Sequence, residues 1–343
     1  MPQGSILGPL LYTIYTLDFP EVVHDKDCPY KSEELSIKFR TMCTECGGIS
    51  CYADDSTYSV TVATTVELLL KLEENIKVMS SYLAENRLCI NTDKTHLLIM
   101  STRQKKRKTK EAIALLNTGK EIISPSRSET LLGFKIQENM NFSEHHLDSK
   151  DSLIKTLNKR VGALKQIKKV ASFKARLNIA NGIVMSKIWY LLPLYGGCPE
   201  YLMRAIQTKQ TEVMRQVTGK RWVIPGKKYV STEELLKECG WLSVRQLSYY
   251  TTVLNVQKTL VNKTPEHIYE ILTRGRERIT RGSVKHSVKR TCVDEARLNL
   301  ASSSFRWRGH KQHSALPDFL KDKGDLKVFK SALKSWVQEN VLI

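Results

Sequence analysis

Apolar positions in the first part of the chain follow helical spacing in some segments and strand spacing in others. Between residues 5 and 17 they recur at helical spacing, which predicts a helix with one buried face that ends before Pro20. Residues 49–53 and 56–62 are rich in β-formers and flank two adjacent acids. This pattern predicts a hairpin with the acids at its tip.

A second group of elements follows this hairpin. Thr64 and Glu67 have the spacing of a capping box, and the apolar positions after them predict an amphipathic helix that ends near Asn86. Residues 87–90 and 96–100 are expected to be short strands, and residues 130–136 to contribute to another strand pair.

From His146 onward the spacing becomes helical almost throughout. The basic, apolar-poor residues 274–290 are expected to be a linker, and residues 305–341 a short tail module. The fold class predicted is α+β for the first 140 residues or so, followed by a mostly α-helical region.

The net charge of the chain says more about its partners than its length does. The 343 residues contain 54 Lys and Arg against 35 Asp and Glu, a formal net charge of +19. One interpretation is an ordinary basic surface. The sharper one is a polyanionic partner, and the clustering of the charge favours nucleic acid.

The number of cysteines and the hydropathy of the chain indicate its cellular compartment. Eight cysteines in a chain of this length do not make a disulfide scaffold, and several are isolated, which suits a reducing compartment. No apolar run is long enough to span a bilayer, and the first residues lack the features of a signal peptide. We therefore expect no membrane partner and an intracellular protein, nuclear or cytoplasmic.

The adjacent acids are Asp54 and Asp55, in the sequence Cys-Tyr-Ala-Asp-Asp-Ser that starts at Cys51. Each carboxylate disfavours ionisation of the other unless a cation lies between them. Mg²⁺ takes carboxylate and phosphate oxygens, and two-metal polymerases use such acids to activate a primer 3′-hydroxyl. The alternative is a plain Asp-Asp hairpin turn.

Four motifs in order carry a family resemblance. They are Pro-Gln-Gly-Ser-Ile-Leu-Gly-Pro-Leu at residues 2–10, Tyr-Ala-Asp-Asp at 52–55, Asn-Thr-Asp-Lys-Thr at 91–95 and Leu-Gly-Phe at 132–134. In order and spacing this set resembles the reverse transcriptases of non-LTR (LINE-type) retrotransposons. The resemblance implies part of a right-hand polymerase palm, an antiparallel sheet with helices, and an RNA-directed DNA polymerase.

The resemblance also implies roles for single residues. It makes Asp54 and Asp55 catalytic Mg²⁺ ligands, and it places Lys94 beside the leaving pyrophosphate. It places Gln3, Gly4 and Tyr52 at the incoming nucleotide, and Leu132 and Gly133 in the hairpin that grips the primer. Each has a plainer interpretation: a surface Gln, a helix-start Gly, a packing Tyr, a solvated Lys, or a sheet edge with a bulge at Gly133.

Residues 155–176 hold eight basic residues and no acid, where the family has its thumb. Repulsion within such a helix is uncompensated, which favours contact with a phosphate backbone over a merely solvated face. The candidate contacts are Lys155, Lys159, Arg160, Lys165, Lys168 and Lys169. The basic residues 103–110 are a second candidate, or simply a basic loop.

The resemblance further implies a third metal-binding carboxylate upstream of the nucleotide-pocket motif. This chain begins inside that motif, so we expect a palm truncated at its N-terminus and little or no polymerase activity from these residues alone. The expected partners are an RNA template, a DNA primer and deoxynucleoside triphosphates. The alternatives are a non-catalytic nucleic-acid-binding remnant, and an interaction protein that keeps only the fold.

A candidate zinc site lies in the polar insertion before the hairpin. His24, Cys28, Cys43 and Cys46 have H-x3-C and C-x2-C spacings, which suit tetrahedral Zn²⁺. The alternative is that the cysteines are small loop residues.

The domain division that we expect has three parts. Residues 1–138 would be the partial palm, 139–225 a helical thumb-like region, and 226–343 a helical C-terminal region that resembles the one after the thumb in some of these elements. Its last module, from Arg306 on, resembles a recurring tail of the same group. Trp307, Phe329 and Trp336 in that tail are expected to be core more than base-stacking residues.

Overall fold

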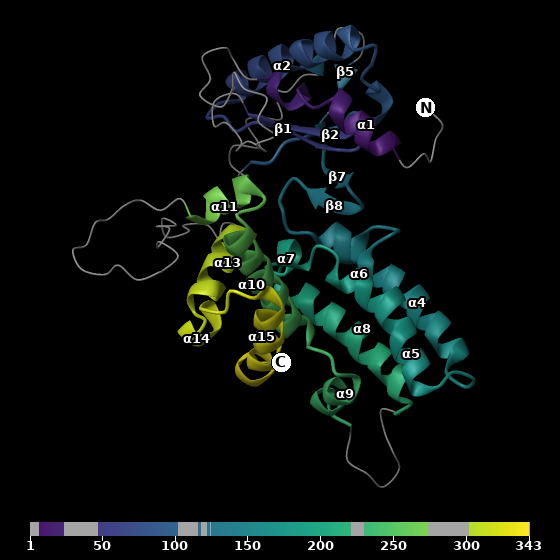
Figure 1. Ribbon diagram of the computed structural model, residues 1–343. Coiled ribbons are helices and arrows are strands. Elements are labelled where there is room, and N and C mark those ends of the chain that lie inside the picture. Colours follow the sequence, from purple (N-terminus) through teal and green to yellow (C-terminus); the bar gives the residue numbers. More distant parts are fainter. Residues whose placement is uncertain are drawn as a thin grey trace, which may run out of the picture. The chain divides into compact units, whose positions relative to one another are not determined.

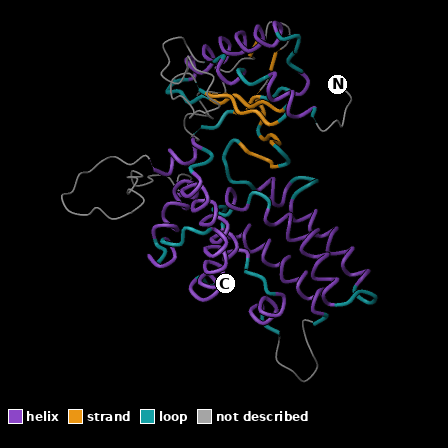
Figure 2. Tube along the Cα trace, in the orientation of Figure 1, coloured by secondary structure: helices purple, strands orange, loops and turns teal. Residues whose placement is uncertain are grey.

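In the computed structural model of the protein, the structure describes residues 7–23, 47–101, 116–117, 122–123, 125–220, 230–273 and 302–342 (Figures 1 and 2). The chain forms two compact units that divide between Glu129 and Thr130. Most of the described residues are helical, and the sheets among them are two-stranded. This composition is compatible with the predicted α+β class. The palm, the thumb and the three-part division remain predictions.

The described part of the first unit combines three two-stranded sheets, β1–β2, β3–β6 and β4–β5, with helices. Its elements are α1 (Gly8–Tyr15), η1 (Phe19–Glu21), β1 (Gly48–Tyr52), β2 (Asp55–Ser59), α2 (Thr65–Glu85), η2 (Thr92–Lys94), β3 (Leu97–Leu98), β4 (Leu116–Asn117), β5 (Ile122–Ile123) and β6 (Pro125–Ser126). Its described buried residues form small clusters, one around Met79, Phe19 and Val23 and another around Leu72. In the first cluster the ring of Phe19 stacks on Tyr82 with centroids 5.3 Å apart.

The predicted helix after the hairpin is confirmed, including its cap. The side chain of Thr64 accepts a hydrogen bond from the backbone N–H of Glu67 at 3.3 Å. The carboxylate of Glu67 in turn accepts from the backbone N–H of Ala63 at 3.3 Å, one residue earlier than in a regular capping box. The helix ends at Glu85, with Asn86 as its C-cap.

Residues 87–90, predicted as a strand, are not one. Arg87 has a φ of 55°, its N–H donates to Ala84, and the N–H of Leu88 donates to the carbonyl of Leu83 at 2.7 Å. These are the bonds of a left-handed helix end, so both amides serve the helix and not a ladder. Of residues 96–100 only Leu97–Leu98 form a strand, paired in parallel with β6.

The predicted buried face of the first helix is also wrong. None of the residues of α1 is buried, and Leu10 and Ile14 are more than half exposed. The helical spacing was interpreted correctly, but no other part of the described chain covers this apolar stripe.

The second unit begins within a hairpin, whose first strand starts two residues before the division, and continues as helices (Figure 1). Its elements are β7 (Ser128–Leu131), β8 (Phe134–Gln137), η3 (Glu144–Asp148), α4 (Leu153–Ile167), α5 (Phe173–Ala180), η4 (Asn181–Met185), α6 (Ser186–Trp189), α7 (Leu192–Tyr195), α8 (Glu200–Thr218), α9 (Thr232–Cys239), α10 (Val244–Asn262), α11 (Glu266–Thr273), α13 (Phe305–Ser314), α14 (Asp318–Lys321) and α15 (Leu326–Asn340). One continuous core joins most of them, and α4, α5 and α8 run side by side in Figure 1.

The basic segment 155–176 is two helices rather than one. Leu157, Val161 and Leu164 form the buried face of α4, as their spacing predicted. The helix ends at Ile167, and Ser172 caps a new helix by accepting from the N–H of Ala175 at 3.3 Å. Ser is a favoured N-cap because its hydroxyl satisfies a free amide at the helix start.

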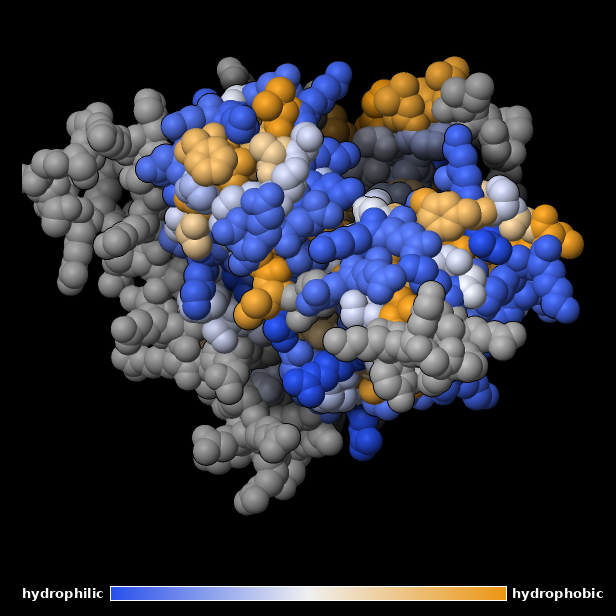
Figure 3. Space-filling view, turned by 90° about the horizontal axis from the view of Figure 1, so that it is seen from below, coloured by the Kyte–Doolittle hydropathy of each residue, from blue (hydrophilic) through white to orange (hydrophobic). Residues whose placement is uncertain are grey.

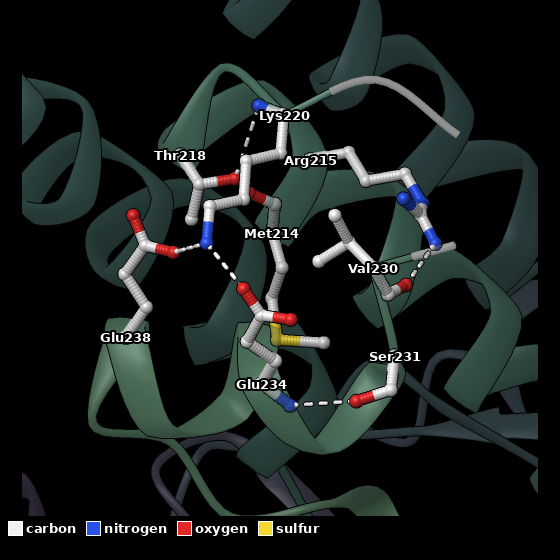
Figure 4. A network of polar contacts seen from close by, with 8 residues as sticks. All are labelled: Met214, Arg215, Thr218, Lys220, Val230, Ser231, Glu234 and Glu238. Carbon is white, nitrogen blue, oxygen red and sulfur yellow. Dashed lines mark hydrogen bonds and ion pairs between the residues drawn. The ribbon is translucent and has the colours of Figure 1, made fainter. Parts of the chain in front are cut away.

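A polar network ties α9 to the end of α8 (Figure 4). The ammonium group of Lys220 lies 2.8 Å from carboxylate oxygens of both Glu234 and Glu238. Arg215 donates to the carbonyl of Val230 at 3.3 Å. The charge of Lys220 is therefore offset within the fold, and the guanidinium of Arg215 is bonded to the backbone.

The tail module packs on α10, and its aromatic residues behave largely as predicted. Phe329 is fully buried, and Trp336 lies with its ring 5.9 Å from Tyr249. Arg308 is also buried and donates to the carbonyls of Ser303 and Pro193 at 2.9 and 2.5 Å. This guanidinium therefore links the tail to the helices around α7. The predicted linker 274–290 lies outside the described residues.

Among the residues that the structure describes, no helix has the length and hydropathy needed to cross a bilayer.

Candidate functional site

The two acids lie at the tip of the β1–β2 hairpin, as the sequence predicted. The strands are antiparallel, Tyr52 pairs with Asp55, and Ala53 and Asp54 form the two-residue turn. Ala53 has a φ of 53°, a left-handed conformation that costs a residue other than Gly some energy and fits a tight turn. Both acids are exposed, and so is Tyr52, at 68%.

Gly47 closes the other end of this hairpin. Its φ is 87°, and a Cβ there would lie 2.6 Å from the carbonyl oxygen of Ser59. Only glycine fits this close backbone approach, so the register that places the acids at the tip depends on it.

Helix α1 brings a tyrosine near the acids that sequence reasoning did not select. Burial raises the pKa of Tyr12, and the negative charges of Asp54 and Cys51 add to the rise. The same segment is fastened to α2, because Tyr15 donates to the carbonyl of Asn86 and Tyr82 donates to Asp18. The sequence signal for Tyr12 was its place in the helix that follows the nucleotide-pocket motif.

The chemistry of the acids suits a hard divalent cation, since Mg²⁺ prefers carboxylate oxygens. The described residues supply two such groups here, and nowhere do they bring three or more His, Cys, Asp or Glu side chains together as a metal site. The four predicted zinc ligands, His24, Cys28, Cys43 and Cys46, lie outside the described residues, as do Gln3 and Gly4.

Lys94 lies in the short helix η2 with its side chain exposed. The segment is held locally: the backbone N–H of Lys94 donates to Asn91 Oδ1 at 3.3 Å, and the Thr95 hydroxyl donates to the Asn91 carbonyl at 2.7 Å. This Asn-x-x-Lys-Thr turn therefore presents the ammonium group to solvent, available to a ligand.

The predicted primer-gripping hairpin is the β7–β8 pair. Leu132 and Gly133 form its two-residue turn, with φ angles of 48° and 76°. Two successive positive φ angles are typical of a type I′ turn, so Gly133 serves the turn and not a bulge. Leu132 is 41% exposed, and the space around Gly133 is open.

An aromatic cluster lies directly after the turn of this hairpin, where β8 begins. Phe134 is buried and lies against His145, with ring centroids 4.2 Å apart. The Nδ1 of His145 accepts from the backbone N–H of Lys135 at 3.3 Å. Burial, with a smaller contribution from His146, lowers the pKa of His145 to about 4, so its ring is neutral at pH 7.

The six basic residues predicted to contact nucleic acid differ in how far the fold engages them. Lys155 donates to the carbonyl of Ser149 at 3.0 Å, Arg160 donates to the carbonyl of Ile183, and Lys165 lies 3.0 Å from Glu212. Lys159 and Lys169 are exposed, and no described acid pairs with either. Lys168 is half-buried.

The sequence analysis did not select the full extent of this basic region. No acid occurs between Asp151 and Glu200, so α4, α5 and α6 carry basic residues without acids, and η4 and α7 carry no charged residue. Lys174 and Lys187 extend the exposed cations beyond α4, and Trp189 is 51% exposed beside them in sequence. Figure 3 shows a largely hydrophilic face with separate apolar patches. The length of the acid-free run was the signal.

Comparison with known proteins identifies relatives of one kind. Over 222 residues the chain is 22% identical to the RNA-directed DNA polymerase from mobile element jockey of Drosophila melanogaster. Over 226 residues it is 24% identical to the probable RNA-directed DNA polymerase from transposon X-element of the same species. Each match covers 65% of this chain and 22% of the relative, so the chain corresponds to a small part of these proteins.

No protein-family model and no solved structure matches the chain. The names of these relatives nevertheless agree with the family that the sequence resembles. They identify the chain as a relative of the reverse transcriptases of non-LTR retrotransposons.

Proposed function

We propose that these residues form part of an RNA-directed DNA polymerase, in which they hold a primer–template and contribute Asp54 and Asp55 to the catalytic metal site. The observation that carries the proposal is the exposed acid pair at the hairpin tip, of which Asp54 lies near enough to Tyr12 of α1 for its charge to help raise the Tyr12 pKa. Residues 1–138 would then belong to the palm, 139–225 to the thumb, and 226–343 to a C-terminal region.

The chemistry proposed is phosphoryl transfer. Mg²⁺, when bound, would activate the primer 3′-hydroxyl and stabilise the leaving pyrophosphate. Asp54 and Asp55 would hold the metal, the exposed ammonium group of Lys94 would offset charge on the leaving group, and the exposed ring of Tyr52 would lie against the nucleotide or primer end. The substrates would be an RNA template, a DNA primer and deoxynucleoside triphosphates.

The 343 residues by themselves are proposed to be close to inactive. The two acids leave most of the coordination positions of a two-metal site to other ligands, and no described group of three could complete it. Primer extension on an RNA template, with Asp54→Asn as the matched control, tests this statement. We expect equal, background incorporation by both proteins. Efficient extension that Asp54→Asn abolishes would contradict it.

A second function, nucleic-acid binding without catalysis, rests on the acid-free run between Asp151 and Glu200. A surface of one sign attracts phosphates and releases counterions on binding. Both functions predict salt-dependent binding of a primer–template. They differ in an assay that supplies the rest of a related polymerase. There, Asp54→Asn should reduce nucleotide incorporation if the chain is catalytic and should not change it if the chain only binds.

A further inference from the structure

One side chain from the helices of the second unit forms a hydrogen bond to the turn of the β7–β8 hairpin. The hydroxyl of Tyr190 donates to the carbonyl oxygen of Leu132 at 2.5 Å, across 58 residues of sequence. Tyr190 is the C-cap of α6 and lies directly before Leu191, whose φ of 55° turns the chain into α7. Its own backbone N–H donates to Ser186, so the residue that reaches the turn is anchored at a helix end.

This bond fixes the direction of a second backbone group. The carbonyl of Leu132 and the N–H of Gly133 belong to one trans peptide group and point in opposite directions. Because Tyr190 holds the carbonyl, the Gly133 N–H is directed away from Tyr190. A Cβ at Gly133 would meet nothing within 4 Å, so the space around this residue is open to a ligand.

Strand β8 of the hairpin is also bound to the helical part of the second unit. Phe134 lies in the core with Phe142 and Tyr195, at centroid distances of 5.4 and 6.2 Å. The Gln137 side chain accepts from the N–H of Glu144 at 2.9 Å, and Lys135 lies 3.3 Å from the Glu144 carboxylate. Strand β8 is therefore fixed from Phe134, directly after the turn, and Tyr190 adds a hydrogen bond to the peptide of the turn itself.

We propose that Tyr190 is a positioning residue that orients the Leu132–Gly133 peptide so that the Gly133 N–H donates to a phosphate oxygen of the bound primer strand. The inference rests on the proposed function, because it takes a primer as the ligand. A backbone amide suits this task, since such contacts fix a strand in position without reading its sequence. Tyr190 itself does not have to touch the primer.

The test measures how tightly wild type and Tyr190→Phe each bind two different primers on the same template. One primer is natural, and the other carries neutral methylphosphonates near its 3′ end. Tyr201→Phe is the matched control, because Tyr201 is an exposed tyrosine of α8 in the same unit. Affinity is measured by fluorescence anisotropy, and hydrogen exchange of the 128–137 segment is followed in each protein.

We expect wild type and Tyr201→Phe to lose roughly two- to tenfold in affinity when the phosphates are neutralised, the range for one hydrogen bond. Tyr190→Phe should bind the natural primer correspondingly more weakly, lose little more on neutralisation, and exchange faster in the hairpin. An equal loss for all three proteins would overturn the proposal. Failure of wild type to bind any primer–template would instead overturn the proposed function and the phosphate contact with it, whereas the exchange data would still report whether Tyr190 holds the turn.

Discussion

The ammonium group of Lys165 lies 3.0 Å from one carboxylate oxygen of Glu212, and Lys209 lies 3.0 Å from the other. Part of the positive charge predicted to meet nucleic acid is therefore offset inside the helical unit. Exposed lysines that no described acid pairs with, such as Lys159, remain available.

This difference predicts unequal effects for two lysines of one helix. Lys159→Gln should reduce the slope of log affinity against log salt by about 0.9 if it removes one phosphate contact. Lys165→Gln should change the slope less, and Glu212→Gln should raise affinity because it frees two ammonium groups. Salt titrations of primer–template binding check all three. Equal slopes for Lys159→Gln and Lys165→Gln would show that the pairing with Glu212 does not matter.

Arg160 is predicted to act in stability more than in binding. Its guanidinium donates to the carbonyl of Ile183, which joins α4 to η4. Arg160→Ala should lower the free energy of unfolding by about 1–3 kcal/mol, because a partly buried carbonyl loses its partner. Urea denaturation measures this, with the exposed Lys159→Ala, expected to stay within about 0.5 kcal/mol of wild type, as the control. If the two variants prove equally stable, Arg160 is not a structural link.

The charge of Asp54 should be measurable at Tyr12. Burial is the largest cause of the raised Tyr12 pKa, and the Asp54 charge adds to it. Removing that negative charge makes the tyrosinate easier to form, so Asp54→Asn should lower the Tyr12 pKa toward its ordinary value near 10. The difference in tyrosinate absorbance between Asp54→Asn and wild type reports the shift, and it should vanish when both proteins also carry Tyr12→Phe. A difference that persists without Tyr12 would place the effect elsewhere.

Buried histidines should make the helical unit sensitive to acid. Burial lowers the pKa of His145 to about 4, whereas an unfolded histidine titrates near 6.5. The unfolded state therefore binds more protons between these values, so stability present above about pH 6.5 is lost as the pH falls toward 4.

His145→Gln should remove part of this dependence, on the order of 1 kcal/mol between pH 7 and 5 after allowance for solvent. Burial also lowers the pKa of His313 to about 4 and lowers the pKa values of His146 and His310, so these residues would keep part of the dependence. Denaturation midpoints at the two pH values measure the effect. An unchanged pH dependence in His145→Gln would show that His145 protonation does not limit stability.

The sequence predicted those parts that depend on local patterns. The hairpin at Asp54 and Asp55, the cap at Thr64 and the buried face of α4 follow from residue spacing and turn chemistry, and all three are confirmed. The resemblance to non-LTR reverse transcriptases agrees with the relatives found.

The predictions that failed concern side chains whose contacts lie far away in the sequence. Spacing indicated that residues 5–17 are helical but could not reveal whether another segment covers Leu10 and Ile14. The run of basic residues did not reveal that Arg160 would bond to Ile183 or that Lys165 would meet Glu212. Tyr190 reaches Leu132 across 58 residues, a contact that only the packed helices create.

The most direct test of the account is the affinity of the 343-residue chain for an RNA–DNA primer–template as salt is raised. With several lysines on phosphates, affinity should fall by about a hundredfold or more between about 50 and 200 mM salt. Replacing Lys159, Lys169 and Lys174 by Gln should weaken binding and flatten this dependence. Replacing the exposed Lys258, Lys327 and Lys330 should have little effect. Weak binding that does not respond to salt, or equal losses from the two triple replacements, would contradict the account.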